Sequence, residues 1–252
     1  MANIALYHTN VLNTDATVTT TGLTSNSEVA YVYDDRLSFK FVNAGSAIRI
    51  QIDQPSGSIL PWEYVAICNH TSLAGGEVTV FKYDTSLRNT APTNTASGVI
   101  SSDNPFVLQN LSGAVRSADQ FIDIEITGPV FGQTWNIGEL MLVPKFTSPQ
   151  RPGVGIATDY LPRITFIPMP NGERQTIKHA ETSRKKTYTI PGLSIAEAQE
   201  WVEVFLANEG AHLVILEDDR GDKYPCFMAT SLTVDDVALT ASIELVFEEV
   251  KL

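Results

Sequence analysis

The stretch Ile48-Arg49-Ile50-Gln51-Ile52-Asp53 sets the fold of the first half of the chain. Its isoleucines alternate strictly with charged or polar residues, which places one set on a buried face of a strand and the other toward water. The run from Leu37 to Val42 alternates in the same way, and Asn43 to Ser46 has the composition of a turn. The two runs are therefore predicted to form a β-hairpin.

Further short runs of β-branched and aromatic residues follow this pattern, at residues 29–33, 62–69, 77–83, 121–127 and 137–143. Gly- and Pro-rich segments separate them, and no helical period intervenes. Many short strands with such connections indicate a mainly β fold, a β-sandwich or jelly roll over residues 1–146. Residues 85–102 contain few large apolar residues and are predicted to form a long surface loop.

The second half of the chain contains a clear helix signal. Ser194 followed by Glu197 is a capping box, in which each side chain accepts a hydrogen bond from the other residue's backbone N–H. Gly210 suits a left-handed cap at the far end. An apolar stripe at helical spacing is expected to be buried, namely Ala198, Trp201, Val202, Phe205 and Leu206.

Short strands surround this helix in the sequence, at residues 186–190, 212–216, 223–229 and 243–247. One helix with several strands predicts a small antiparallel α+β domain over residues 162–252. Prolines and glycines without a consistent period mark the stretch before it. Residues 147–161 are therefore predicted to be a linker between two domains.

Composition narrows the possible functions. The chain of 252 residues has 17 basic and 29 acidic residues, a formal charge of −12, and only 18% charged residues. Such a chain repels phosphate, so no nucleic acid partner, anionic membrane surface or membrane insertion is expected. Residues 1–10 lack a signal-peptide pattern. Cys68 and Cys226 are expected to be buried, reduced thiols, as in a protein made in a reducing cytoplasm.

No catalytic constellation is found in the sequence, so we expect no enzyme, cofactor or metal site. The four histidines, at positions 8, 70, 179 and 212, are far apart and lack metal-ligand spacing. A pair of catalytic carboxylates, as in a glycosidase, stays possible, because the distance between them is set by the fold and not by their positions in the sequence. Asp34-Asp35 favours a solvated turn, with a calcium site as the alternative.

Two further motifs have both a structural and a functional interpretation. Arg220-Gly221-Asp222 lies where a hairpin must reverse and is expected to be its turn; recognition by an adhesion receptor is the alternative. Trp62 and Tyr64 begin a strand and are expected to enter the core. Alternatively, they form an aromatic platform for a sugar, beside loops rich in Asn, Ser and Thr.

Charge is distributed unevenly in the second half of the chain. The basic run from Arg184 to Lys186 is expected either to protect a strand edge or to dock on an acidic neighbouring subunit. The second alternative suits a closed ring, in which each subunit needs two unlike, complementary faces. The interface candidates are Arg184, Lys185, Lys186, Glu217, Asp218, Asp219, Glu248 and Glu249.

A resemblance to the distal tail proteins of tailed bacteriophages rests on three segments. These are the strand at Trp135 to Leu142, the helix segment from Leu193 to Phe205, and the hairpin from Leu213 to Pro225. The first half resembles a galactose-binding-like (discoidin-like) jelly roll only in its general pattern of strands. In distal tail proteins the ring-forming domain comes first, whereas here the sandwich does.

The resemblance implies a structural subunit of the virion tail, made in the host cytoplasm, that joins the tail tube to the tip or baseplate. Its expected partners are other copies of itself in a six-membered ring, other tail proteins and a host surface glycan. A carbohydrate-binding, lectin-like module or a receptor-binding tail protein is the alternative. A glycan-degrading enzyme is the least favoured interpretation.

Overall fold

The computed structural model describes residues 2–13, 16–21, 41–43, 47–56, 59–109, 120–153, 156–161, 164–168, 174–178, 183–208, 212–228, 233–237 and 240–250. Within them the protein is mainly β and divides into two compact units. The sandwich unit is Tyr7–Lys145. The split unit combines Met1–Leu6 with Phe146–Leu252, so its chain is discontinuous in sequence.

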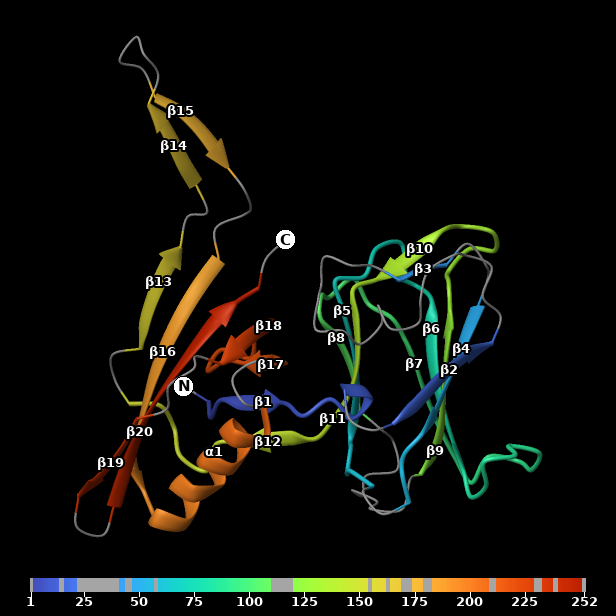
Figure 1. Cartoon of the computed structure of the whole chain (residues 1–252), viewed down its shortest axis with the longest axis horizontal. Helices are drawn as coiled ribbons and strands as arrows, with labels where there is room; N and C mark the ends of the chain where they lie inside the picture. The colour runs from blue at the N-terminus through green and yellow to red at the C-terminus, as the bar shows by residue number, and fades with distance from the viewer. Residues whose placement is uncertain are drawn as a thin grey trace. The chain divides into compact units, whose positions relative to one another are not determined.

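Antiparallel sheets build the sandwich unit (Figure 1). The largest has five strands in the order β2 (Thr17–Thr21), β4 (Ala47–Asp53), β9 (Phe121–Thr127), β6 (Glu77–Tyr83) and β7 (Asn94–Val99). A second has the order β11 (Glu139–Val143), β5 (Tyr64–Cys68) and β8 (Phe106–Gln109). A third pairs β10 (Trp135–Ile137) with β3 (Phe41–Asn43), and the 3₁₀ helix η1 spans Val11–Asn13.

The alternation in β4 decides which face of the large sheet is buried. Ile48, Ile50 and Ile52 are almost wholly inaccessible to solvent and pack in the core of the unit, which confirms the prediction from their period of two. Trp62 also lies in this core and is fully buried. The tryptophan therefore offers no platform to a ligand, and the core interpretation of this residue is confirmed.

The predicted hairpin between residues 37–42 and 48–52 is wrong. Strand β4 pairs with β2 on one edge and β9 on the other, and β3 pairs with β10. Residues 29–33 and 37–40 lie outside the described part of the chain. The long loop predicted at residues 85–102 is partly wrong as well, because its second half forms strand β7, which pairs with β6. This edge strand consists mostly of small polar residues, which give no periodic signal.

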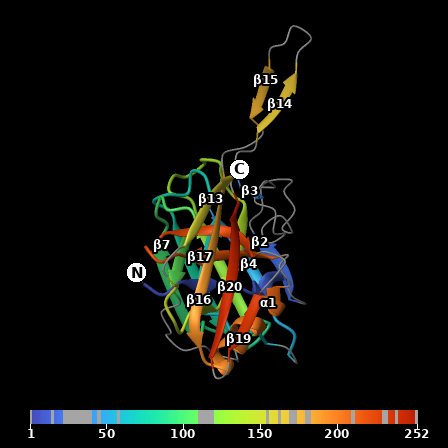
Figure 2. The same ribbon diagram turned by 90° about the vertical axis from the view of Figure 1, so that its left-hand side faces the viewer.

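The split unit is built on an eight-stranded sheet. Its path is β12 (Lys145–Thr147), β1 (Ala5–Tyr7), β17 (Leu213–Glu217), β18 (Lys223–Met228), β20 (Thr240–Glu249), β16 (Ser183–Leu193) and β13 (Ala157–Leu161), and β19 (Thr233–Val237) also pairs with β20. Figure 2 shows β13, β16 and β20 side by side, with β19 and helix α1 toward one end. Strands β14 (Ile164–Pro168) and β15 (Arg174–Lys178) form a separate two-stranded sheet.

Two segments of the split unit differ from the sequence-based expectations. The stretch expected as a linker, residues 147–161, contains the end of β12 and the whole of β13, which pairs with β16. The N-terminal residues, assigned by sequence to the first domain, supply β1 to this sheet, where Ile4 and Leu6 are fully buried. Strands β1 and β13 are short, and each pairs with strands that are distant in the sequence.

Helix α1 spans Ile195–Asn208, and its capping box is confirmed. The Ser194 backbone N–H donates to Glu197 Oε2 at 2.7 Å, and the Glu197 N–H donates to Ser194 Oγ at 3.2 Å. The buried face differs from the expected stripe: Val204 is buried, whereas Leu206 is 62% exposed. The helix is turned so that Trp201 lies at the centre of the contact, where its ring meets Phe146 edge-on at 4.8 Å. Gly210 lies outside the described residues.

Other sequence-based expectations concern cysteines and membranes. Cys68 and Cys226 are both fully buried, as predicted. Burial raises the pKa of the Cys226 thiol, so it stays protonated. In the part of the chain that the structure describes, no helix has the length and hydropathy needed to span a membrane.

Candidate functional site

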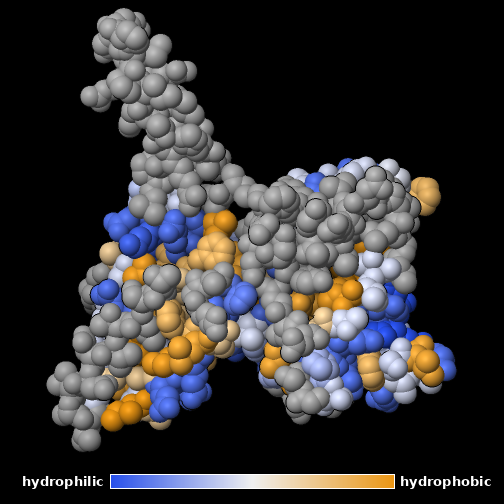
Figure 3. Space-filling model, viewed as in Figure 1, coloured by the Kyte–Doolittle hydropathy of each residue, from blue (hydrophilic) through white to orange (hydrophobic). Residues whose placement is uncertain are grey.

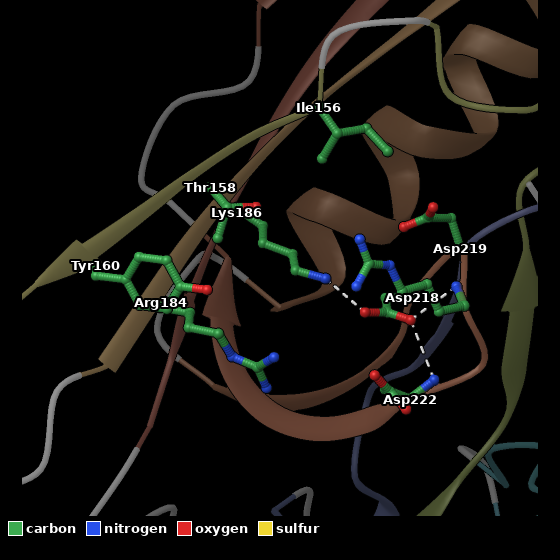
Figure 4. A pocket seen from close by; sticks show the side chains of 9 residues that line it. Ile156, Thr158, Tyr160, Arg184, Lys186, Asp218, Asp219 and Asp222 are labelled. Carbon is green, nitrogen blue, oxygen red and sulfur yellow. Dashed lines mark hydrogen bonds and ion pairs between the residues drawn. The ribbon is translucent and has the colours of Figure 1, made fainter.

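A polar pocket of about 470 Å³ lies in the split unit (Figure 4). Strand β13, strand β16 and the turn between β17 and β18 enclose it. Its lining contains three cationic and three carboxylate side chains together with Ile156, Thr158 and Tyr160. The charged residues are Arg184, Lys186, Asp218, Asp219, Arg220 and Asp222.

A buried ion pair lies at one wall of this pocket. Lys186 Nζ is 2.5 Å from Asp218 Oδ2, and the two side chains are 9% and 0% exposed. Asp218 Oδ1 also accepts the backbone N–H groups of Arg220 and Asp222, at 2.9 and 3.1 Å. Burial by itself would raise the pKa of Asp218, but the hydrogen bonds from Lys186 and from these backbone groups outweigh it, so the pKa is lowered. The carboxylate is therefore charged at neutral pH.

A second ion pair fixes Arg184. Its Nε and Nη2 atoms donate to the two carboxylate oxygens of Glu249 at 2.8 and 3.0 Å, a bidentate arrangement. The hydrogen bond that Arg184 donates to Glu249 raises the pKa of this guanidinium. The ring of Tyr224 lies under both cations, 4.7 Å from Arg184 Cζ and 5.4 Å from Lys186 Nζ. Figure 3 shows hydrophilic residues gathered over the end of β13 and the adjoining end of β16.

The structure thus brings together residues that the sequence analysis proposed as opposite faces of a ring. Arg184 binds Glu249 and Lys186 binds Asp218 within one chain, while Asp219 lines the same pocket. Glu217 is 4.0 Å from Lys223. Lys185 and Glu248 lie opposite each other on β16 and β20. Arg184 and Lys186 each have a counter-ion inside the subunit, so their charges are not available to attract an acidic face of a neighbouring subunit.

The tripeptide Arg220-Gly221-Asp222 forms the turn between β17 and β18, as predicted. Gly221 has a φ of 88°, and its N–H donates to the Asp218 carbonyl oxygen at 2.9 Å. Glycine adopts this left-handed conformation without steric cost. All three residues are exposed, so the Arg220 and Asp222 side chains reach the solvent at the mouth of the pocket.

A second candidate site lies on the sandwich unit, where three loops meet. We call residues 69–76, 101–105 and 128–136 the loop surface. The Asn69 N–H donates to Asn104 Oδ1 at 2.5 Å, and Thr71 pairs with Asn136 through a β-bridge. The Gly75 N–H donates to the Ile100 carbonyl at 2.8 Å. The first two contacts join residues 69–76 to each of the other two loops.

The backbone of the loop surface is held in unusual conformations. Asn69 and Ser72 have φ values of 52° and 60°, which non-glycine residues seldom adopt. At Gly128 a side chain would come within 2.7 Å of the Trp135 indole, so only glycine fits. Strained backbone held by its surroundings is concentrated at functional sites, which makes the loop surface a candidate.

Phe131 is the most exposed large apolar side chain of the described residues, at 89%. It lies at the tip of a turn in which the Gln133 N–H donates to the Val130 carbonyl at 3.2 Å and Gly132 has a φ of 77°. Around it the loops are neutral and polar: within residues 69–76, 101–105 and 128–136, Asp103 is the one acidic residue and there is no Lys or Arg. An exposed aromatic ring thus belongs to a loop surface that also carries amide and hydroxyl groups.

A charged network on the large sheet has a structural role. Asp123 is fully buried and binds Arg49 at 2.8 Å and Arg88 at 2.5 Å, and Arg88 also pairs with Asp53. Arg88 belongs to the connection between β6 and β7 and has a φ of 48°. Its guanidinium therefore fastens this loop to the sheet.

The remaining candidates do not converge on a site. His70 Nε2 lies 2.8 Å from the Asp103 carbonyl oxygen, and burial lowers the pKa of His8 to about 4. His212 is partly exposed. His179 and Asp34-Asp35 lie outside the described residues. Among the residues that are described, no three His, Cys, Asp or Glu side chains group as a metal site requires.

Sequence reasoning missed the loop surface and the pocket. Phe131 is flanked by Pro129 and Gly132, a turn signal, but nothing in the sequence distinguishes an exposed phenylalanine from a buried one. The sequence shows the charges around Lys186, but their pairing joins β16 to a turn residue 32 positions later.

Comparisons with known proteins found distant likenesses among solved structures. No protein-family model matches the chain, and no curated protein matches it. Among solved structures, chitosan-binding module 1 of a chitosanase/glucanase from Paenibacillus sp. IK-5 is similar, with 15% identity, a TM-score of 0.40, and coverage of 54% of this chain and 100% of that one. Module 2 of the same enzyme, bound to chitotriose, has 16% identity and a TM-score of 0.39 over 53% of this chain and 99% of that one.

A GH29 fucosidase from Ruminococcus gnavus in complex with fucose is also similar, with 14% identity and a TM-score of 0.39. The match covers 55% of this chain but only 27% of the fucosidase. Likenesses this distant assign neither a ligand nor an activity to the chain. None of these comparisons tests the bacteriophage assignment, which stays a prediction.

Proposed function

We propose that this protein is a glycan-binding protein, rather than an enzyme, and that the loop surface of its sandwich unit holds a neutral saccharide. The observation that carries the proposal is the exposure of Phe131 at the tip of a turn beside neutral polar loops. Sugars present C–H faces that pack against an aromatic ring, and their hydroxyls bond to amides and hydroxyl groups.

The surroundings of Phe131 support this role. Exposed Thr71, Ser72 and Asn104 supply donors and acceptors on the neighbouring loops. The hydrogen bonds between the loops fix their backbone before a ligand arrives, which lowers the entropy cost of binding. The near absence of charged residues favours a neutral ligand, because a charged one would find no counter-ion other than Asp103.

Binding of neutral oligosaccharides to the full chain tests this proposal. Chitotriose and fucose, the ligands of two similar structures, are the first probes, followed by an array of neutral glycans. Changing Phe131 to Ala removes the stacking surface, and burying a phenylalanine contributes about 1.5–3 kcal/mol. We expect the variant to bind at least about tenfold more weakly by isothermal titration calorimetry.

Leu87→Ala is the matched control. Leu87 is 77% exposed in the same unit but belongs to the loop between β6 and β7, so its truncation should leave the affinity unchanged. Equal affinity of the wild type and Phe131→Ala would contradict the proposed site. Failure of the wild type to bind any neutral glycan of the array would contradict the proposed function.

As a second function we propose the expected one, a subunit of a bacteriophage tail that assembles into a ring within the virion. The observation that favours assembly is the hairpin of β14 and β15, which in the described chain pair only with each other. An isolated two-stranded sheet is marginal in water and needs a partner surface. Residues 162–178, which include this hairpin, carry three basic residues and one acidic residue in a chain of net charge −12. Both functions would meet in a receptor-binding tail subunit.

A further inference from the structure

The polar pocket of the split unit contains groups that the fold already uses and groups that it does not. Lys186 and Asp218 bind each other, and Arg184 binds Glu249 through Nε and Nη2. These pairs hold the side chains in place. An ammonium group has three donors and a guanidinium five, so N–H groups of Lys186 and Arg184 remain for a ligand.

Three side chains complete the pocket, and within the described residues no side-chain hydrogen bond or ion pair holds them. Arg220 and Asp222 enter the turn through their backbone N–H groups, and their side chains lie exposed at its mouth. Tyr160 on β13 is 67% exposed. In Figure 4 the Tyr160 hydroxyl and the Arg184 guanidinium point toward the same space, with Lys186, Asp218 and Asp222 around it.

The charges of the lining restrict the ligand. Three cationic and three carboxylate side chains line one space, so a charged ligand would meet charges of its own sign there as well as counter-ions. A hydroxyl group both donates and accepts, and it can bridge a carboxylate and a guanidinium without adding charge. The volume of about 470 Å³ is within the usual range for small-molecule sites.

We propose that this pocket binds a neutral polyhydroxylated molecule of monosaccharide size, a sugar or a cyclic polyol. Arg220 and the remaining N–H groups of Lys186 and Arg184 donate to its oxygens, Asp222 and Asp219 accept from its hydroxyls, and the Tyr160 ring borders its apolar face. The site belongs to the split unit and does not depend on Phe131 of the loop surface.

Ligand-observed NMR on the full chain tests the pocket, with glucose, galactose, N-acetylglucosamine and myo-inositol as separate probes. The Arg220→Ala variant keeps the backbone bond to Asp218 and should remain folded, with an unchanged melting temperature. We expect it to bind the preferred probe about tenfold more weakly, because hydrogen bonds to charged groups are the strong ones. Lys223→Ala, on the same hairpin but outside the pocket, is the control and should bind normally.

Two further measurements separate this proposal from the loop surface and from a charged ligand. Phe131→Ala should retain binding in the pocket, and Arg220→Ala should retain the Phe131-dependent binding. The two variants therefore test the two proposed sites independently. Affinity for a neutral ligand should change by less than about twofold between 50 and 500 mM NaCl, because screening acts on charges. Binding of glycine or phosphate in place of polyols, or equal binding by wild type and Arg220→Ala, would overturn the assignment.

Discussion

Lys186 and Asp218 show how much depends on single residues in this chain. Each is buried, and each is the counter-ion of the other. Removing one member of a buried pair leaves an uncompensated charge, which costs about 3–5 kcal/mol. Reversing the basic run at residues 184–186 to glutamates would therefore place new carboxylates against Asp218 and Glu249, and it would unfold the subunit rather than test assembly.

The residue-scale prediction concerns Lys186→Met. We expect the free energy of unfolding in urea to fall by about 3–5 kcal/mol at pH 7. The control Lys185→Met, one position along β16 and partly exposed, should cost less than about 1 kcal/mol, as surface charges do. A loss below about 1 kcal/mol for Lys186→Met would show that the pair does not stabilise the fold.

The same pair predicts a pH dependence. The pKa of Asp218 is lower in the folded state than in the unfolded chain. Its contribution to the free energy of unfolding is therefore complete above about pH 4 and is lost as the pH falls toward the lowered pKa. Lys186→Met removes one cause of that lowering. The stability difference between wild type and variant should therefore shrink between pH 7 and pH 3, and a constant difference would contradict this assignment.

Strand β1 belongs to the sheet of the split unit although it comes from the start of the chain. It lies between β12 and β17, and the Ser148 N–H donates to the Ile4 carbonyl at 2.9 Å. Ile4 and Leu6 belong to the same core cluster as Trp201. A strand from the start of the chain thus completes a sheet whose other strands come from the second half.

Truncation of this strand gives the element-scale prediction. The double variant Ile4→Ala with Leu6→Ala removes two fully buried side chains, each worth about 2–5 kcal/mol. Amide hydrogen exchange should accelerate in β17 and β18, while β4 and β9 of the sandwich unit keep their protection. Equal acceleration in both units, or in neither, would show that β1 does not belong energetically to the split unit.

At the scale of the whole molecule, net charge governs association. With −12 on every subunit, copies repel one another at low ionic strength, and salt screens this repulsion. Residues 162–178 carry a net positive charge in an acidic chain, which suits them to contact another copy. Complementary charge of this kind guides register more than it adds affinity.

The whole-molecule prediction is a closed ring, with six copies, visible by electron microscopy of the full chain at about 0.5 M NaCl, where the Debye length is only a few ångströms. Arg174→Glu combined with Lys178→Glu should prevent ring formation, and Lys223→Glu should not. A protein that stays monomeric at every salt concentration would contradict the ring unless a tail template restores it.

Several features of the fold were predictable from the sequence because they are local. The isoleucines of residues 48–52 report a buried face through their period of two, and Ser194 with Glu197 reports a helix start through bonds three residues apart. The turn at Gly221 is also predictable locally, from the glycine and its immediate neighbours. Each of these signals depends on neighbours within a few residues, so no knowledge of the rest of the fold is needed.

Only the tertiary structure decided the partners of these elements and both candidate sites. Strand β4 pairs with β2 and with β9, about 70 residues later, rather than with the adjacent run, and the counter-ion of Lys186 lies 32 residues away. Whether Phe131 is exposed and Trp62 buried depends on which loops and strands surround them. Such pairings are selected by the packing of the whole core, because a short strand or a single charge is compatible with many partners until the remaining sheet excludes all but one.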